Sequence, residues 1–250
     1  MPSLPAARVV LVHGSVANAT ATWRAQEPLA AEFELVVPNR RGFPPGPELA
    51  GVDFEDEADW LLERVGAGAH LVGHSYGGVI ALLAAARRPA ALRSLTVIEP
   101  PAFGVAPGNA AAAAIVRASQ ALWAQREALD ERRFLQEFLG LVGAGSSVLP
   151  DPLPADLAQG TRLLKRERPP GDAQIPFATL RAAGLPVLVV SSGATPALEA
   201  VCDTIASELA AERVVFPGTR HAVQFVGRPF NELLAAFVRR AEAGAATGRR

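Results

Sequence analysis

The chain has 250 residues, of which half are hydrophobic and a fifth are charged, as expected for a globular protein with one sizeable core. Lysine and arginine number 24 against 25 aspartates and glutamates, and this balance argues against a nucleic-acid-binding protein, which carries a basic excess. The densest basic run, Arg162–Arg168, is expected to be a solvated helix end. The single cysteine, Cys202, is expected to be buried and unreactive.

The N-terminal segment lacks the pattern of a targeting signal. Its first apolar run, Val9–Val12, ends at His13 after four residues. Such a run is too short for the apolar part of a signal peptide or for a membrane span. We therefore expect a cytoplasmic protein that does not bind a membrane.

Six short apolar runs predict β-strands, because each is ended by glycine or a polar residue. Most are rich in Val, Leu and Ile without alternation, which is typical of strands buried on both faces of a parallel sheet. The runs are Val9–Val12, Glu34–Val37, His70–Val72, Leu95–Ile98, Val187–Val190 and Arg213–Phe216. Helix-like segments alternate with them, namely Asp53–Arg64, Gly77–Arg87, Pro196–Leu209 and Asn231–Arg240. This alternation predicts an α/β fold with a mostly parallel six-stranded sheet and helices on both faces.

The segment Gly73-His74-Ser75-Tyr76-Gly77 is a G-x-S-x-G motif between a predicted strand and a predicted helix. A nucleophilic serine needs this shape, because small flanking residues let backbone approach closely at a strained turn. The helix N-terminus beneath it favours developing negative charge. In this context the motif predicts that Ser75 is a nucleophile, against the alternative of a glycine-rich turn with an incidental serine.

Around this motif the sequence resembles the α/β-hydrolase family over residues 8–240. Val10-Leu11-Val12-His13-Gly14 is similar to the family's first core strand and oxyanion turn. Pro38–Phe43 resembles its Pro-Asp-x-Arg-Gly segment, with Asn39 in place of the usual aspartate. Gly218–Ala222 resembles the loop that holds the catalytic histidine. Two strands found at the start of many members are missing, so a reduced core is expected.

The resemblance implies roles for individual residues. The backbone N–H groups of Ser15 and Tyr76 would form the oxyanion hole, and His221 would be the base, since the histidine comes last in the family's chain order. His13 is expected to hold the oxyanion turn by hydrogen bonds, and His70 to be a core or edge residue. The residues assigned to substrate binding are His13, Gly14, His74 and Trp123. No metal and no cofactor is expected.

In most members of the family a carboxylate completes a catalytic triad with the serine and the histidine, and it follows the penultimate strand. Residues 191–198, which stand at that place here, contain no carboxylate. Glu99, which follows the strand Leu95–Ile98, is predicted to replace it, as in a minority of the family that includes haloalkane dehalogenases and zearalenone lactonases. Pro100 favours extended backbone at Glu99. The alternatives are a solvated strand-end charge, or an acid supplied by Glu199 or Asp203.

Between Pro101 and Pro186 lie roughly 85 residues, too many for one crossover connection. They predict helices over Asn109–Asp130, Glu131–Val142 and near Asp156–Arg166. By resemblance this insert is a helical cap, residues 102–183, on a hydrolase core of residues 1–101 and 184–250.

The sequence thus predicts a serine hydrolase that cleaves a carboxylic ester or lactone through an acyl-enzyme. Its expected partner is a small apolar ester or lactone substrate, and the sequence gives no indication of an oligomeric state. A carbon–carbon bond hydrolase, a non-hydrolytic tailoring enzyme and a catalytically inactive small-molecule binder are the alternatives.

Overall fold

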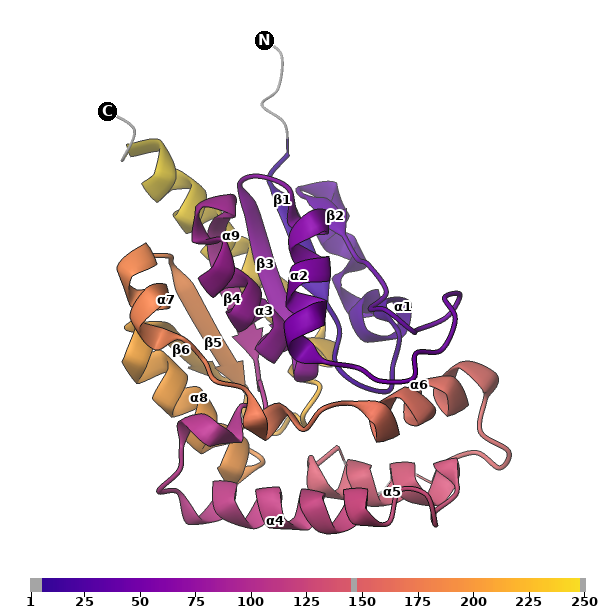
Figure 1. The fold of residues 1–250 in the computed structure, drawn as a ribbon. Coiled ribbons are helices and arrows are strands. Elements are labelled where there is room, and N and C mark those ends of the chain that lie inside the picture. Colours follow the sequence, from indigo (N-terminus) through magenta and orange to yellow (C-terminus); the bar gives the residue numbers. More distant parts are fainter. Residues whose placement is uncertain (1–5, 145–147, 248–250) are drawn as a thin grey trace.

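The computed structural model describes residues 6–144 and 148–247. Within these residues six strands form one sheet in the order β2-β1-β3-β4-β5-β6, and every neighbouring pair is parallel (Figure 1). The strands are β1 (Arg8–Val12), β2 (Glu34–Val36), β3 (Ala69–His74), β4 (Leu92–Ile98), β5 (Val187–Ser191) and β6 (Glu212–Val215). The predicted α/β fold and its parallel sheet are confirmed.

Helices cover both faces of the sheet because its central strands are apolar on both sides. One face packs against α2 (Phe54–Val65), α3 (Tyr76–Arg87), α7 (Phe177–Ala183) and α8 (Pro196–Leu209). The other packs against α1 (Ala19–Trp23) and α9 (Arg228–Thr247). The prediction ended α9 at Arg240, but the helix continues because residues 241–247 are mostly alanine and other residues that tolerate helical backbone.

Short 3₁₀ helices connect these elements. They are η1 (Arg24–Ala31), η2 (Pro89–Ala91), η3 (Phe103–Val105), η4 (Pro170–Asp172) and η5 (Val223–Val226).

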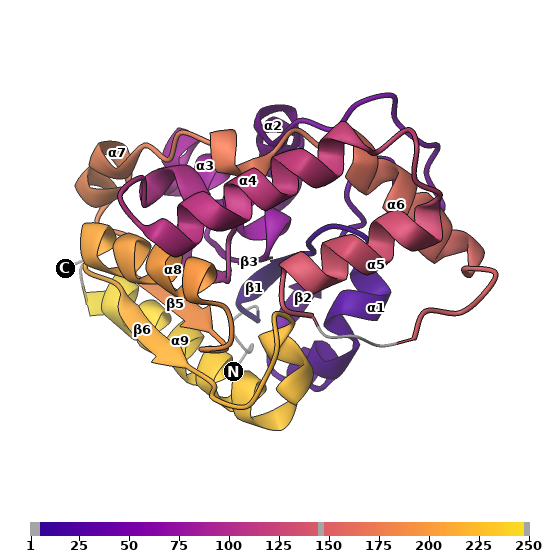
Figure 2. The same cartoon turned by 90° about the horizontal axis from the view of Figure 1, so that it is seen from below.

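Three helices of the insert lie beyond the carboxyl ends of the strands (Figures 1 and 2). They are α4 (Ala110–Ala124), α5 (Glu131–Leu141) and α6 (Ala155–Arg166). The helix predicted over Asn109–Asp130 ends at Ala124, because the Asp130 side chain accepts a hydrogen bond from the Arg133 N–H at 2.7 Å and caps α5 instead. The domain boundaries at residues 102 and 183 stay predictions.

Cys202 is fully buried in α8, so the prediction of a buried cysteine is confirmed, and burial raises the pKa of its thiol above the usual range. In the described part of the chain no helix combines the length and the apolarity that crossing a membrane requires.

The basic run at residues 162–168 contains the end of α6, and Arg166 and Arg168 are exposed there, as the sequence predicts. Arg162 and Arg166 both pair with Glu48, and Glu167 is buried with only 5% of its surface exposed. Glu167 is the exception within the run, because α6 lies against the loop after β2 and the chain carries this side chain into the interior.

The turn from β3 into α3 is held by backbone packing. A Cβ atom on Gly77 would lie 2.4 Å from the carbonyl oxygen of His13 and 2.5 Å from that of Val12. A Cβ atom on Gly73 would lie 2.3 Å from the carbonyl oxygen of Gly77. The first turn of α3 can therefore rest directly on β1 only because these positions have no side chain.

This packing predicts opposite effects for two helical glycines. Gly140→Ala in α5, where no atom lies within 4 Å of the added Cβ, should raise the free energy of unfolding by about 0.5–1 kcal/mol through helix propensity. Gly77→Ala should lower it, because the added atom collides with backbone rather than with a movable side chain. Urea unfolding of both variants beside the parent measures this, and equal effects of the two substitutions would contradict it.

Candidate active site

Ser75 stands on a strained turn at the carboxyl end of β3. Its backbone has φ 54° and ψ −126°, a conformation that non-glycine residues rarely adopt and that persists only when the surroundings enforce it. The Ser75 N–H donates to the Ile98 carbonyl at 2.8 Å, which ties the turn to β4. The turn therefore presents the Ser75 hydroxyl above the sheet.

The loop after β1 lies directly beside Ser75, because β1 and β3 are neighbours in the sheet. A Cβ atom on Gly14 would lie 2.8 Å from Cβ of Ser75, so glycine permits this approach. The connections from β1 and β3 leave in opposite directions along the sheet, to β2 and to β4. This is the position at which open parallel sheets bind their ligands.

His221, in the loop after β6, completes a chain of hydrogen bonds with Ser75 and Glu99. The Ser75 hydroxyl donates to Nε2 of His221 at 2.9 Å. The Nδ1–H of His221 donates to Oε2 of Glu99 at 2.7 Å. The three side chains that the sequence proposes as nucleophile, base and acid are thus brought together from three separate loops.

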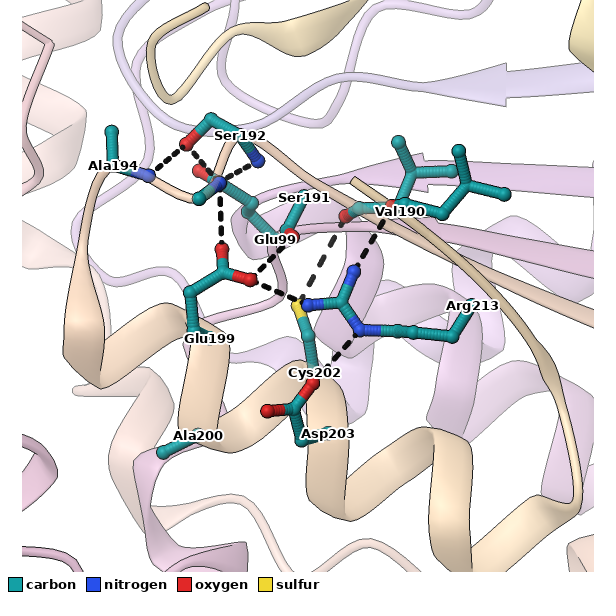
Figure 3. A network of polar contacts seen from close by, with 12 residues as sticks. Glu99, Val190, Ser191, Ser192, Ala194, Glu199, Ala200, Cys202, Asp203 and Arg213 are labelled. Carbon is teal, nitrogen blue, oxygen red and sulfur yellow. Dashed lines mark hydrogen bonds and ion pairs between the residues drawn. The ribbon is translucent and has the colours of Figure 1, made fainter. Parts of the chain in front are cut away.

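Glu99 is fully buried, and its second oxygen is also satisfied. Oε1 accepts hydrogen bonds from the backbone N–H and the hydroxyl of Ser192, at 2.6 and 2.5 Å (Figure 3). Burial opposes ionisation of this carboxyl group, but the hydrogen bonds from His221 and Ser192 outweigh burial and hold its pKa below the usual range. Glu99 is therefore a carboxylate at neutral pH.

The backbone of Glu99 departs from the extended geometry that Pro100 predicts. Its φ is 44°, in the left-handed region, while its N–H still donates to the Val190 carbonyl at 3.0 Å. The prediction is wrong because the chain must turn sharply off the end of β4 to aim the carboxylate at His221. Nor is Glu99 a solvated strand-end charge, since it is fully buried.

The two alternative acids have other partners (Figure 3). Glu199 accepts from the Ser191 hydroxyl at 2.7 Å and the Gly193 N–H at 2.9 Å, and it pairs with Arg213. Asp203 pairs with Arg213 at 3.0 Å. Glu199 thus links α8 to the end of β5, both carboxylates link α8 to Arg213 in β6, and the geometry favours Glu99 beside His221.

Two further histidines are buried and support the site as neutral rings. The Nε2–H of His74 donates to the His221 carbonyl at 3.1 Å, which fixes the loop that carries the proposed base. In His13, Nδ1–H donates to the Gly14 carbonyl at 2.9 Å and Nε2 accepts from the Arg40 N–H at 2.8 Å. Burial lowers the pKa of each imidazole to about 3, helped by the charge of Arg40 at His13 and of His221 at His74.

Ser15 and Tyr76, which the sequence assigns to an oxyanion hole, adjoin Ser75, because Tyr76 follows it in the chain and Ser15 follows Gly14, which packs against it. Tyr76 is the first residue of α3, so its N–H has no acceptor within the helix. Ser15 follows Gly14 in the turn after β1. Both residues line a cavity beside Ser75.

Two cavities within the described residues meet at Ser75. The larger, about 650 Å³, lies under α4 and is mainly apolar, with Phe103, Ile115, Val116 and Trp123 in its wall. The smaller, about 570 Å³, is lined by His74, His221, Leu135, Leu139 and Phe225. Ser15, Ser75 and Phe138 belong to both.

Of the four residues that the sequence assigns to substrate binding, two line a cavity and two do not. Trp123 lines the larger cavity and also packs edge-on against Phe134, with ring centroids 5.3 Å apart. His74 lines the smaller cavity. His13 and Gly14 lie behind Ser75 and shape the turn, and neither forms part of the wall of these two cavities.

Comparison with models of known families agrees with this geometry. Residues 9–236 match the model of the "Alpha/beta hydrolase family". The chain belongs to the alpha/beta hydrolase family. The resemblance inferred from the sequence motifs is thereby confirmed.

Individual proteins similar to this α/β hydrolase share a minority of its residues. A protein of Pantoea ananatis (strain LMG 20103) named "Putative carbamate hydrolase RutD" is 36% identical over 100 residues, which cover 37% of this chain and 36% of that protein. The crystal structure of NosK from Streptomyces actuosus has a TM-score of 0.63 at 25% identity, over 95% of this chain and 99% of that one. Est816, described as an N-acyl homoserine lactone degrading enzyme, has a TM-score of 0.62 at 24% identity, over 92% and 93%.

Several residues of this α/β hydrolase site escaped the sequence analysis. Ser192, which holds Glu99, lies in the loop noted only for its missing carboxylate, and Arg40 and Glu167 form a buried pair near Ser15. The sequence signal for Glu167 was its position as the one acid within a basic run.

Among the described residues, no group of three or more His, Cys, Asp or Glu side chains is arranged to hold a metal ion.

The buried histidines predict a stability that falls in mild acid. Unfolded histidines take up protons below pH 6.5, whereas folded His13 and His74 resist protonation down to about pH 3. The free energy of unfolding should therefore decrease as pH falls from 6.5 towards 3, by up to about 1.4 kcal/mol per pH unit for each histidine. Urea unfolding at pH 7, 6 and 5 measures the slope. In His74→Gln the free energy of unfolding should fall less steeply with decreasing pH than in the parent. An unchanged slope would contradict the low pKa assigned to His74.

Proposed function

We propose that the chain is a serine hydrolase that cleaves a carboxylic ester or lactone through an acyl-enzyme. The observation that carries the proposal is the unbroken hydrogen-bond chain from Ser75 through His221 to Glu99, at 2.9 and 2.7 Å. Nucleophile, base and orienting acid in this relation form the arrangement that activates a serine hydroxyl. Ser75 opens onto both cavities, so a substrate carbonyl can reach it.

In the proposed acylation step, Oγ of Ser75 attacks the carbonyl carbon while Nε2 of His221 takes the hydroxyl proton. The carbonyl oxygen becomes an oxyanion that accepts hydrogen bonds from the backbone N–H groups of Ser15 and Tyr76. The N-terminus of α3 adds favourable potential at the same place. Glu99, an ionised carboxylate, stabilises the imidazolium and fixes its tautomer.

His221 next gives its proton to the leaving oxygen, and the carbon–oxygen bond of the ester breaks. Water then enters, His221 removes one of its protons, and the resulting attack releases the acid and restores Ser75. In a lactone the first step opens the ring, so the leaving oxygen becomes a hydroxyl group that remains on the acyl chain, and the second step releases a single hydroxy acid.

The positions of the cavities orient the proposed substrate. The leaving oxygen must come within reach of Nε2 of His221, and His221 lines the smaller cavity. The leaving group therefore belongs in the smaller cavity and the acyl group in the larger one. Because Phe103, Ile115 and Trp123 line the larger cavity, we propose an apolar acyl group.

The similar proteins support this class of reaction. Est816 is described as degrading a lactone, and the P. ananatis relative is named for carbamate hydrolysis. Esters, lactones and carbamates all react through a tetrahedral intermediate that needs the same hydrogen-bond donors. Against an inactive small-molecule binder stands the intact chain of Ser75, His221 and Glu99, which mere binding does not need.

A fluorophosphonate probe tests the nucleophile. It should label Ser75 covalently, and Ser75→Ala should lose the label and on the order of 10⁶ in kcat on an aryl ester, because no other group replaces the attacking oxygen. Ser207→Ala, at an exposed serine of α8, is the control and should keep both. Mass spectrometry of the labelled peptide locates the adduct. Labelling that persists in Ser75→Ala would refute the assignment.

Glu99→Gln tests the acid, because it keeps the shape of the side chain and removes its charge. It should lower kcat by roughly 10²–10⁴, since an amide neither fixes the correct tautomer of His221 nor stabilises its cation. Glu199→Gln and Asp203→Asn should stay within several-fold of the parent. Full activity of Glu99→Gln together with collapse of Asp203→Asn would move the acid to α8, and three active variants would indicate a Ser–His dyad.

A further inference from the structure

The turn that carries Ser15 holds an unfavourable backbone conformation. Val16 has φ 71°, and for a β-branched residue this left-handed geometry is a genuine outlier. Such a conformation persists only where neighbouring structure enforces it. Since Ser15 lies at the junction of both cavities, the groups that enforce this turn also set the position of the Ser15 N–H.

One of these groups is the backbone of α6, which comes from the insert. A Cβ atom on Gly160 would lie 1.9 Å from the Val16 carbonyl oxygen, so helix and turn are in direct backbone contact. Val16 is itself part of the apolar cluster of α5 and α6, with Phe134 and Leu164. The insert therefore packs onto the oxyanion turn as well as roofing the cavities.

Glu167, the residue after α6, binds the same turn through its carboxylate. Oε2 accepts a hydrogen bond from the Ser15 hydroxyl at 2.5 Å, and Oε1 accepts from Nη2 of Arg40 at 3.0 Å. Nη1 of Arg40 in turn donates to the Gly14 carbonyl at 3.0 Å. Two consecutive residues of the turn, Gly14 and Ser15, are thus bonded to one buried ion pair.

The charges in this cluster explain why Glu167 needs Ser15. Fully buried Arg40 serves two carboxylates, since its Nε also donates to Oε2 of Glu57 at 2.5 Å. Burial raises the pKa of Glu167, although Arg40 and the Ser15 hydroxyl oppose the rise. Because Glu57 is an independent partner for Arg40, neutralising Glu167 leaves no buried cation without a carboxylate.

We propose that Glu167 is a positioning residue for the oxyanion hole, which fixes Ser15 from the end of α6 so that its backbone N–H meets the developing oxyanion. The inference rests on the proposed function of Ser75 and Ser15. The oxyanion exists only in the transition state and the intermediate, so loss of this support lowers kcat and leaves KM nearly unchanged.

Glu167→Gln and Ser15→Ala test the proposal, with kcat and KM measured on an aryl ester. Each variant should lose about 10- to 100-fold in kcat with KM within threefold, since one donor of an oxyanion hole is weakened rather than removed. The double variant should be no slower than the slower single variant, because both substitutions break the same hydrogen bond. The Ki of an arylboronic acid, which forms a tetrahedral adduct on Ser75, should rise by a similar factor.

Glu48→Gln is the matched control. Glu48 pairs with Arg162 and Arg166 and so holds α6 from its other side, away from Ser15. This variant should keep the kcat of the parent within threefold. Equal losses in Glu48→Gln and Glu167→Gln would show that general docking of α6 matters and not the contact to Ser15. A fully active Glu167→Gln, or losses that multiply in the double variant, would also overturn the proposal.

Amide hydrogen exchange of the peptide that contains residues 13–16 separates this inference from the proposed function. Exchange should speed up in Glu167→Gln and Ser15→Ala and stay at the parent rate in Glu48→Gln. If the parent is neither labelled by fluorophosphonate nor active on esters, the proposed function fails, and exchange still decides whether Glu167 holds the turn. Ser15→Ala removes only a hydroxyl, so it serves where Glu167→Gln does not fold.

Discussion

The close approach of backbone at the start of α3 is the constraint on which the site depends. The first turn of α3 lies on the carbonyl groups of Val12 and His13, and this contact leaves no room for a Cβ atom at Gly77. It brings the ends of β1 and β3 together, so that Ser15, Ser75 and Tyr76 line the same cavity. The proposed nucleophile and two candidate oxyanion donors are thus placed by a single backbone contact.

Around this point the protein buries charged groups and gives each of them at least one oppositely charged or hydrogen-bonding partner. The carboxylate of Glu99 receives hydrogen bonds from His221 and Ser192, and Arg40 lies between Glu57 and Glu167. A buried charge without such partners would be strongly destabilising, so these groups fix the loops that carry them. Hydrogen bonds and ion pairs therefore help to hold the loops at the carboxyl edge, in addition to the apolar core beneath them.

The insert between β4 and β5 shapes what the site can accept. Its helices supply most of the apolar wall of the larger cavity, and α6 reaches the turn after β1 through Gly160 and Glu167. The same segment thus determines the wall of the larger cavity and contacts the turn beside Ser75. Variation in the insert is consequently expected to change rate as well as specificity, although the sheet beneath it stays the same.

The sequence by itself determined the sheet, the G-x-S-x-G turn of Ser75 and the order along the chain of the loops that form the site. Strand burial appears as unbroken apolar runs, and the G-x-S-x-G turn of Ser75 is a local pattern, so both can be predicted from a few neighbouring residues. His221 and Glu99 followed from their places after predicted strands taken together with the resemblance to the α/β-hydrolase family. Tertiary structure alone decided that Ser192 holds Glu99 and that Glu167 holds Ser15, contacts that span 93 and 152 residues. It also set the left-handed backbone of Glu99, because the direction of a buried carboxylate is imposed by its partners and not by the residue that follows it.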